Sequence, residues 1–402
     1  MTKKSDAPAI RFKGFSDAWE QRKVGDLLIE RNQQAPMSDE YPLMAFIANE
    51  GVAPKGERYD RSALVTDTVN KLYKKTEKGD FIYSSNNLET GSIGLNKYGK
   101  ACISPVYSIF EPTGIADSDF LGRRLVRKDF INAMVKWRQG VIYGQWRIHE
   151  SDFLKIEIPV PSVEEQRKIG AYLDQLDNLI TLHQRKFEKL TNVKKSMLEK
   201  MFPQNGSSYP EIRFKGFTDP WEQRKLGEVS ESYSGGTPSV GVKEYYGGKI
   251  PFIRSAEINS EITELFLTEE GLKNSSARLV GVGDILYALY GATSGEVGRA
   301  RLKGAINQAI LAIKPHTGYD SEYLAQWLRK SKHSIIETYL QGGQGNLSGT
   351  IVKELSVDFP LLKEQQAIGD FFSRLDNLIT LHQRELEKLQ NIKKSMLEKM
   401  FV

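Results

Sequence analysis

Two long segments of the sequence repeat their apolar residues with the heptad spacing of a coiled-coil helix. One heptad position of residues 163–201 is occupied by Ile169, Leu176, His183, Leu190 and Met197. The second segment has Ile368, Leu375, His382, Leu389 and Met396 in the same frame. Five successive heptads in each predict a coiled coil. Because the apolar stripe is wider than two heptad positions, we expect each helix to contact more than one partner. The positions that we expect to pair helices or form a subunit interface are Leu176, Leu179, Ile180, His183, Phe187, Leu190, Leu375, Leu378, Ile379, His382, Leu386 and Leu389.

The sequence is duplicated. Leu-Asp-Asn-Leu-Ile-Thr-Leu-His-Gln-Arg occurs at residues 176–185 and again at 375–384. Ile-Arg-Phe-Lys-Gly-Phe, which begins at Ile10 and at Ile212, precedes each copy, followed by Trp-Glu-Gln-Arg-Lys. The spacing of about 200 residues is far longer than a solenoid repeat. The chain therefore reads as domain, helix, domain, helix.

The two domain interiors share a skeleton but differ in their loops. Gly79-Asp-Phe-Ile-Tyr83 matches Gly283-Asp-Ile-Leu-Tyr287, and a segment favouring strands follows in each copy. An amphipathic helical pattern comes next. The strand-rich segments are Ala101–Phe110 and Ala305–Ile313, and the helical patterns are Asp119–Trp137 and Ser321–Leu340. Each copy is thus predicted to be a mixed α/β domain, one scaffold carrying two different loop sets.

The signals at the helix ends are unequal. Ser162 with Glu165 predicts a capping box at the first long helix, whereas Leu361 stands at the matching place of the second. The Pro-, Gly- and Ser-rich residues 203–210 read as a linker. If a pseudo-two-fold axis relates the copies, the helices pair antiparallel with one domain at each end, as in a dumbbell. His183 and His382 would then meet near the axis as a polar pair that fixes register.

Composition narrows the classes of protein. The net charge of +5 permits an anionic partner without requiring one. Cys102 is the only cysteine, which excludes an intrachain disulfide and points to a reducing compartment. We expect no signal peptide and no membrane span, because no long apolar run exists.

No local motif supports catalysis. Residues 94–100 have the glycine spacing of a phosphate-binding loop, but Ala101 lacks the hydroxyl for magnesium and a strand follows. We therefore expect a turn between strands there. The chain has no cofactor-binding glycine motif and no Asp/Asn-Pro-Pro-aromatic motif of a DNA methyltransferase, and we expect no metal site.

Polar residues in glycine-marked turns are candidates for DNA contact. Their side chains donate to and accept from base edges and phosphates, although turns use the same residue types for structural reasons. The candidates are Ser84, Ser85, Asn86, Asn87, Tyr143, Gln145, Arg147, Thr237, Arg254, Tyr290, Thr293, Ser294, Gln344 and Asn346.

The sequence resembles the specificity (S) subunit of Type I restriction-modification systems. The resemblance rests on the repeated motifs above, on Pro-x-x-x-Glu-Gln at residues 161–166 and 360–365, and on the Leu-Asp-x-Leu-Ile that follows each. The resemblance covers nearly the whole chain. It implies two α/β target recognition domains separated by two long antiparallel coiled-coil helices, with internal duplication and pseudo-two-fold symmetry. The expected parts are an N-terminal arm with recognition domain 1 (1–158), spacer helix 1 (159–202), a linker (203–212), recognition domain 2 (213–357) and spacer helix 2 (358–402).

The resemblance also implies a function. Each recognition domain would read one half of a bipartite, asymmetric site in double-stranded DNA, and the helices would set the spacing and dock two methylation subunits. Adenine methylation with S-adenosylmethionine, and cleavage driven by ATP with magnesium, would belong to the methylation and restriction subunits. This chain would be non-catalytic and cytoplasmic, and would bind no cofactor itself.

Two alternatives stay open. A protein–protein scaffold with domain–rod–domain geometry would show weak or absent DNA binding together with the methylation partners. A cryptic enzyme would transfer methyl groups or cleave DNA without partners.

The register interpretation of the histidines can be tested. Replacing both His183 and His382 by leucine should leave helix pairing intact or tighten it, because leucine fits an apolar heptad position better than a polar residue. Thermal unfolding of the double variant measures this, and collapse of the fold would contradict the interpretation.

Overall fold

Two compact units make up the chain. A computed structural model describes residues 7–54, 71–140, 146–204, 206–340 and 346–402. Unit 1 contains the residues up to His183 together with Glu385–Val402, and unit 2 contains Gln184–Arg384. Each unit therefore holds the first part of one long helix and the last part of the other.

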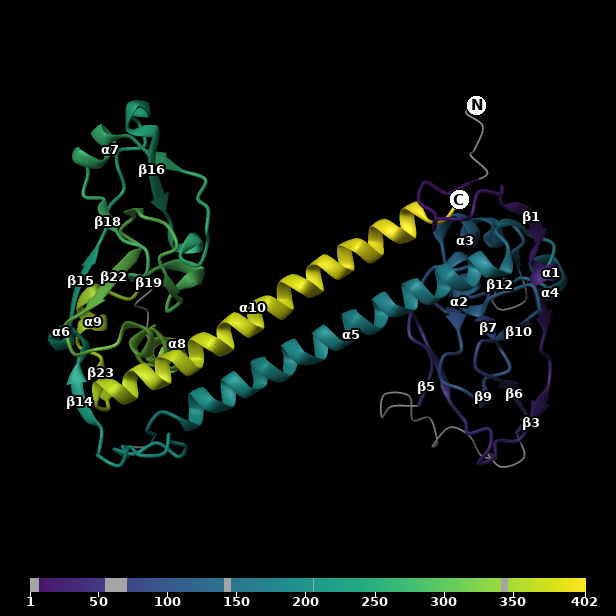
Figure 1. Ribbon diagram of the computed structural model, residues 1–402, viewed down its shortest axis with the longest axis horizontal. Helices are drawn as coiled ribbons and strands as arrows, with labels where there is room; N and C mark the ends of the chain where they lie inside the picture. Colours follow the sequence, from purple (N-terminus) through teal and green to yellow (C-terminus); the bar gives the residue numbers. More distant parts are fainter. Residues whose placement is uncertain (1–6, 55–70, 141–145, 205, 341–345) are drawn as a thin grey trace. The chain divides into compact units, whose positions relative to one another are not determined.

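The globular part of unit 1, from β1 to β13, is named head 1 (Figure 1). Strand β1 (Glu20–Lys23) pairs antiparallel with β13 (Glu157–Val160) and so joins the two ends of the head. An antiparallel sheet has the order β2 (Leu28–Glu30), β10 (Ser108–Pro112), β7 (Phe81–Tyr83), β8 (Ile93–Leu95). A second sheet has β3 (Gln34–Ala35), β6 (Tyr73–Thr76) and β9 (Ala101–Ile103). Two hairpins, β4 (Ala45–Ile47) with β5 (Gly51–Ala53) and β11 (Gln139–Gly140) with β12 (Trp146–Arg147), complete the strands of the described part. The helices are α1 (Val24–Leu27), α2 (Ser118–Arg124), α3 (Lys128–Val135) and α4 (Glu150–Phe153).

Head 2, from β14 to β23, repeats this plan in unit 2. Strand β14 (Glu222–Lys225) pairs with β23 (Ser356–Phe359), and one sheet has the order β15 (Ser230–Ser234), β22 (Ile310–Pro315), β19 (Ile285–Ala288), β20 (Val297–Arg299). The other sheet, β17 (Phe266–Leu267), β16 (Tyr246–Ile253), β21 (Gly304–Ile306), β18 (Arg278–Val280), contains a parallel pair, β16 with β21. The α-helices are α6 (Leu226–Val229), α7 (Glu269–Lys273), α8 (Ser321–Leu340) and α9 (Gly349–Lys353). The predicted mixed α/β class and duplication are confirmed.

The two long helices are α5 (Val163–Lys200) and α10 (Leu362–Lys399), each of 38 residues. In unit 1, Lys393 of α10 pairs with Asp177 of α5 at 2.5 Å. In unit 2, Lys194 of α5 pairs with Asp376 of α10 at 2.5 Å. The first part of each helix lies beside the last part of the other, which confirms the antiparallel pairing. The division between the units falls at His183, so the predicted meeting of His183 with His382 stays a prediction.

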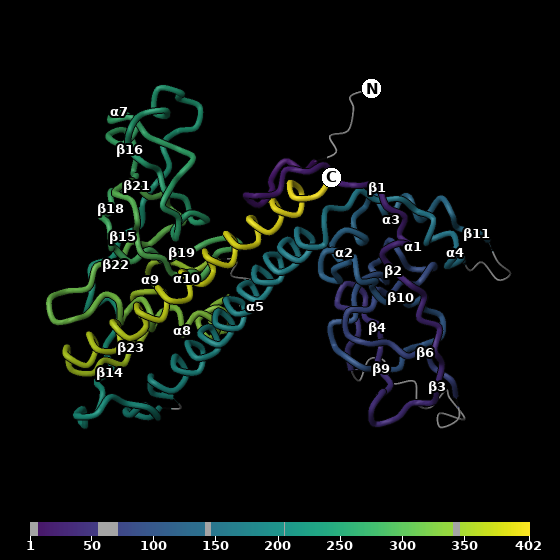
Figure 2. Tube along the Cα trace, turned by 45° about the vertical axis from the view of Figure 1, so that its right-hand side comes forward, coloured from purple at the N-terminus to yellow at the C-terminus, as the bar shows by residue number. Residues whose placement is uncertain are grey.

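Each head core is completed by the end of the other head's helix. Phe401, just past α10, lies 5.3 Å from the ring of Phe120 in head 1, whose ring also packs on Trp19. Phe202, just past α5, lies 5.4 Å from Tyr323 in head 2. Both phenylalanines are buried. The end of α10 lies beside the start of α5 in both views of unit 1 (Figures 1 and 2).

Two predicted elements are divided in the structure. The segment Ala101–Phe110 forms β9 and β10, which belong to different sheets, and Ala305–Ile313 divides in the same way into β21 and β22. The pattern over Asp119–Trp137 predicted one helix but forms α2 and α3, because the backbone is extended at Arg127 (φ −71°, ψ 148°). The Arg127 guanidinium donates there to the Leu397 carbonyl of α10, a contact that no local pattern contains.

Glycines allow α5 and α10 to cross the heads closely. A Cβ at Gly170 would lie 2.6 Å from Asp117 Oδ1, and a Cβ at Gly369 would lie 2.7 Å from Asp320 Oδ1. These two carboxylates cap the helices α2 and α8, accepting hydrogen bonds from Phe120 N and Tyr323 N. An added methyl group would therefore displace a helix cap.

We predict that Gly170→Ala and Gly369→Ala each lower the free energy of unfolding by about 1–3 kcal/mol, the cost of overpacking. Alanine at an open helical position would instead raise stability by about 1 kcal/mol. The exposed Asn178→Ala and Asn377→Ala, on the same helices, are the matched controls. Urea denaturation of the full chain decides the sign, and stabilisation by the glycine substitutions would contradict the close crossing.

Candidate functional site

The repeated Glu of the Pro-x-x-x-Glu-Gln segment fastens each long helix to the entrance of its unit. Arg11 Nε and Nη2 donate to the two carboxylate oxygens of Glu165 at 2.8 and 2.6 Å. Arg213 binds Glu364 in the same way, at 2.7 Å for both bonds. Both glutamates are buried, and their hydrogen bonds raise the pKa of each arginine. The predicted capping box is thus only half correct: Ser162 Oγ accepts from Glu165 N at 3.4 Å, but the Glu165 carboxylate binds Arg11.

The Gln that follows joins each long helix to a helix of the head. Gln166 Oε1 accepts from Asp117 N at 3.0 Å, and its Nε2 donates to the Pro161 carbonyl at 3.0 Å. Gln365 repeats both bonds, to Asp320 N at 2.9 Å and to the Pro360 carbonyl at 2.8 Å. The residues that carry the sequence resemblance therefore fix how each head sits on its own helix.

Two of the described DNA-contact candidates of head 1 accept hydrogen bonds from the backbone at β12. Ser85 Oγ accepts from Ile148 N at 3.0 Å, and Asn86 Oδ1 accepts from Trp146 N at 2.6 Å. Ser84 is only 5% exposed, which removes its hydroxyl from a surface role in this conformation. Asn87 and Arg147 are exposed, and Arg147 lies 3.8 Å from Glu150.

The candidates of head 2 are also engaged within the chain. Thr237 Oγ1 donates to Gln308 at 2.5 Å, and Arg254 binds Glu257 and Glu264 at 3.0 and 2.7 Å. The buried Ser294 donates to the Gly291 carbonyl at 2.9 Å, and Thr293 Oγ1 donates to the Tyr290 carbonyl at 3.4 Å.

Asn346 is exposed, whereas Tyr143, Gln145 and Gln344 lie outside the described residues. A DNA role for any of the candidates stays a prediction. The described candidates that are exposed are Asn86, Asn87, Arg147, Thr237 and Asn346.

Residues 94–100 form a turn between β8 and β9, as expected, and not a phosphate-binding loop. The buried Asn96 closes this turn: its Oδ1 accepts from Tyr98 N and Gly99 N, and its Nδ2 donates to the Gly99 carbonyl. The side chain thus satisfies the backbone groups that a phosphate would need.

Two exposed tryptophans of head 1 were not selected from the sequence. Trp137 and Trp146 are 41% and 49% exposed, while Trp19, Trp221 and Trp327 are buried. The Arg138 guanidinium lies 5.9 Å from the Trp146 ring and is itself held by Glu89 through two 2.7 Å hydrogen bonds. An exposed indole fixed in this way is a preorganised contact surface. The sequence signal was an aromatic residue inside a polar, glycine-marked turn.

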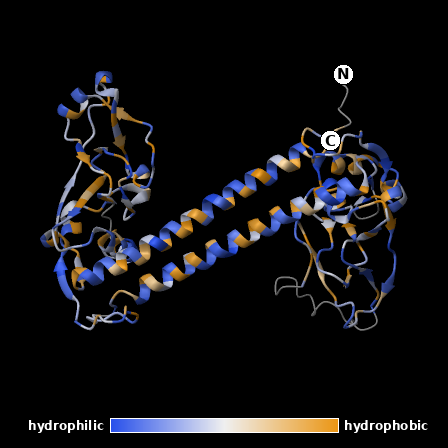
Figure 3. Cartoon of the chain, viewed as in Figure 1, coloured by the Kyte–Doolittle hydropathy of each residue, from blue (hydrophilic) through white to orange (hydrophobic). Residues whose placement is uncertain are grey.

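The helix positions expected to pair divide into buried and exposed sets. Leu176 and Leu375 are buried against the heads, and Leu190 and Leu389 pack at the edge of the head cores. Leu179 and Leu378 are 43% exposed in both copies. Figure 3 shows apolar and polar residues alternating along both helices. The other expected positions, Ile180, His183, Phe187, Ile379, His382 and Leu386, are half-buried.

Leu182 and Leu381, which the heptad frame did not select, are 46% and 52% exposed. With Leu179 and Leu378 they form what we name the leucine faces, one on each helix. An open groove also runs along α5 between Arg185 and Met197. The two helices thus expose leucine side chains at matching positions.

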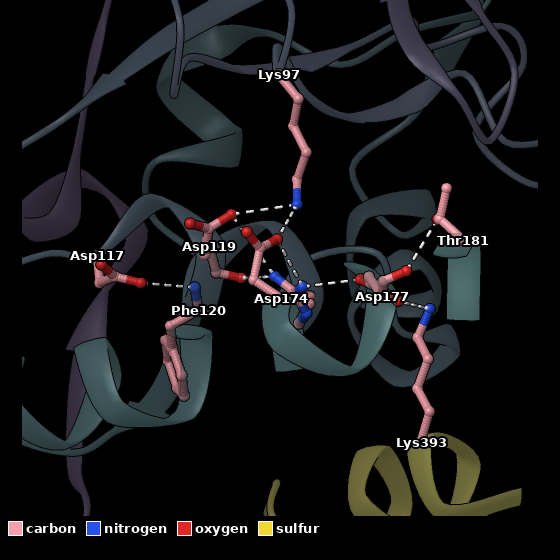
Figure 4. Close-up of polar contacts among 9 residues, drawn as sticks. Lys97, Asp117, Asp119, Phe120, Asp174, Asp177, Thr181 and Lys393 are labelled. Carbon is pink, nitrogen blue, oxygen red and sulfur yellow. Dashed lines mark hydrogen bonds and ion pairs between the residues drawn. The ribbon is translucent and has the colours of Figure 1, made fainter. Parts of the chain in front are cut away.

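A network of charges joins head 1 to both helices (Figure 4). Asp177 of α5 accepts from Arg123 of α2 at 2.9 Å and from Lys393 of α10 at 2.5 Å. Asp174 accepts from Lys97 at 2.6 Å and from Arg123 at 3.2 Å. These hydrogen bonds, that of Lys97 foremost, lower the pKa of Asp174.

Among the described residues, no group of three or more His, Cys, Asp or Glu side chains is placed to hold a metal ion. None of the described helices has the length and apolar character needed to cross a membrane.

Comparison with known proteins agrees with the duplicated fold. A family model described as the Type I restriction modification DNA specificity domain matches residues 16–192 and 218–391. The MjaVIII specificity subunit of Methanocaldococcus jannaschii is 25% identical over 406 residues, covering 94% of this chain and 91% of that protein. The MjaIX specificity subunit of the same organism is 31% identical over 190 residues, and the match spans 45% of this chain and 44% of that subunit.

A solved structure shares the fold. The S subunit of a Type I restriction-modification system from M. genitalium superposes with a TM-score of 0.65 at 15% identity, covering 98% of this chain and 99% of that one. Two matches to the family model, one in each repeat, account for most of the sequence. The chain therefore belongs to the family of specificity subunits of Type I restriction-modification systems.

Proposed function

We propose that this chain chooses the DNA sequence for a Type I restriction-modification complex, with each head reading one half of a bipartite, asymmetric site. The observation that carries the proposal is the contrast between the two parts of each unit. The Arg–Glu pair that fastens each long helix to its unit is the same in both copies, whereas the described strands of the outer sheets differ: β3-β6-β9 in head 1 and β17-β16-β21-β18 in head 2.

Two heads that are attached to the long helices in the same way but carry different loops are suited to two different half-sites. Exposed lysines and arginines supply sequence-blind attraction to phosphates, which weakens as salt rises. Side chains at the loops supply discrimination, worth about 1–3 kcal/mol for each bidentate contact with a base. Linking two readers raises the affinity of the pair through effective concentration.

The long helices would serve as both spacer and dock. The leucine faces occur once on α5 and once on α10, which suits two copies of one methylation subunit. Those subunits would bind S-adenosylmethionine and methylate adenine, and restriction subunits would use ATP and magnesium. This chain would contribute recognition alone, in the cytoplasm.

The proposal is tested by mapping methylated adenines in cells that contain or lack this chain, together with its partners. We expect one bipartite motif to disappear without it. Replacing head 1 (20–160) by the matching head of another specificity subunit should change one half of the motif and leave the other half and the gap unchanged. If the head replacement changes both halves of the motif, the two heads do not read their half-sites independently. If the methylated motif persists in cells without this chain, a scaffold role is favoured.

The docking role predicts a separate effect. Replacing Leu182 and Leu381 by serine should reduce co-purification of the methylation subunits, because each buried leucine side chain contributes about 1.5–3 kcal/mol. The same substitution at Val106 and Val240, which are 68% and 79% exposed on the heads, is the control. Unchanged assembly of the leucine variant, with the melting temperature preserved, would exclude the leucine faces as the dock.

A further inference from the structure

One aspartate in each unit connects three elements that lie far apart in the sequence. Asp177 and Asp376 occupy the same position of the Leu-Asp-Asn-Leu repeat. Asp177 joins α5 to α2 through Arg123 and to α10 through Lys393 (Figure 4). Asp376 joins α10 to α8 through Gln326 at 2.9 Å and to α5 through Lys194 at 2.5 Å.

These contacts differ from ordinary surface ion pairs. The side chains of Asp177 and Asp376 are 33% and 34% exposed, and the Arg123 side chain is 11% exposed. Arg123 also binds Asp174, and Gln326 also binds Glu322, so that each donor bridges two carboxylates. Partly buried, multiply connected charges hold a geometry better than isolated exposed pairs.

The two copies conserve the carboxylate and the lysine but not the donor from the head. Head 1 offers a guanidinium at Arg123, whereas head 2 offers the amide of Gln326, with Arg329 at 3.7 Å from Asp376. The common feature is therefore the connection itself: one aspartate fastens a head to its own helix and to the end of the other.

A change in the angle of a head at this connection would displace the loops that face DNA under the proposed function. A domain of about 150 residues has a radius of gyration of about 15 Å. Tilting it by about 15° moves its outer loops by about 4 Å, close to the ~3.4 Å rise of one base pair. A small change of angle at the base of a head therefore shifts its outer loops by about the rise of one base pair.

We propose that Asp177 and Asp376 are positioning residues that hold each head at a fixed angle on the helix pair and so restrict the complex to one gap between its half-sites. This inference rests on the proposed function. The helices set the approximate distance, and the two aspartates exclude neighbouring gap lengths. Neither residue contacts DNA in this scheme, so the half-site sequences do not depend on them.

The test uses the complete complex with Asp177→Asn and Asp376→Asn, singly and together. Asparagine keeps the size of the side chain but loses the charge that Lys393 and Lys194 bind. The readout is the methylated adenines across a genome, sorted by half-site sequence and by gap. We expect unchanged half-sites and a rise of about tenfold in methylation at gaps one base pair longer or shorter, a ratio equal to about 1.4 kcal/mol. Asp370→Asn, an exposed carboxylate of α10, is the control.

A second pair of variants tests the donor in head 1. Arg123→Gln copies the donor of head 2 and should keep the single gap, because Gln326 donates there to Asp376, the counterpart of Asp177. Arg123→Leu removes the donor and should broaden the gap. A merely structural role would lower the melting temperature in both without altering the gap distribution.

The outcomes separate this inference from the function on which it rests. Methylation confined to the original gap in the Asp177→Asn, Asp376→Asn double variant would overturn the positioning role and leave sequence recognition intact. Loss of all methylation in an assembled double variant would also overturn it, because the half-sites should still be read. If cells that lack this chain still methylate the same bipartite motif, the proposed function itself is refuted.

Discussion

The structure depends on the insertion of a phenylalanine from the end of each long helix into the core of the opposite repeat's head. Phe401 stacks on Phe120 in unit 1, and Phe202 packs between Trp221 and Tyr323 in unit 2. The backbone repeats the arrangement, since Ile10 N donates to the Lys399 carbonyl as Ile212 N donates to that of Lys200. Each sequence repeat therefore lacks one wall of its own core. Burying an aromatic side chain contributes about 1.5–3 kcal/mol, so each head core is stabilised by a residue of the other repeat.

That constraint explains which parts of the repeats agree. Arg11 and Arg213, Glu165 and Glu364, and the two helix-crossing glycines all lie where a head meets the long helices. A change at such a position would leave a buried charge unpaired or force two helices apart. In the outer sheets the described strands differ between the copies: head 1 has β3-β6-β9 with a parallel bridge from Leu43 to Cys102, whereas head 2 has β17-β16-β21-β18 with β16 parallel to β21.

The sequence was most informative where structure is local. The heptad pattern predicted the bounds of α5 to within one residue and the existence of α10 in the same frame, because an apolar stripe repeats along a single helix. It failed where a contact with a residue far away in the sequence determines the local structure. Glu165 was expected to complete a capping box, but its carboxylate binds Arg11. The helix expected over residues 119–137 is interrupted at Arg127, whose guanidinium donates to the Leu397 carbonyl. Ser84 and Ser294 read as accessible turn residues, yet both are buried. Polar residues in turns satisfy backbone groups first, so residue type alone separates structural from DNA-facing roles poorly.

The internal pairing of charge also bears on how the heads would use DNA. Arg138, Arg147 and Arg254 all have carboxylate partners in their own head. A cation already paired within the protein contributes less to phosphate attraction than a free one, and the net charge is only +5. Under the proposed function, each head by itself would bind DNA weakly, and the affinity of the chain would come from linking two heads. Rigid seating of the heads would then be part of recognition, because a head that tilts freely would lose much of the effective concentration that linkage provides.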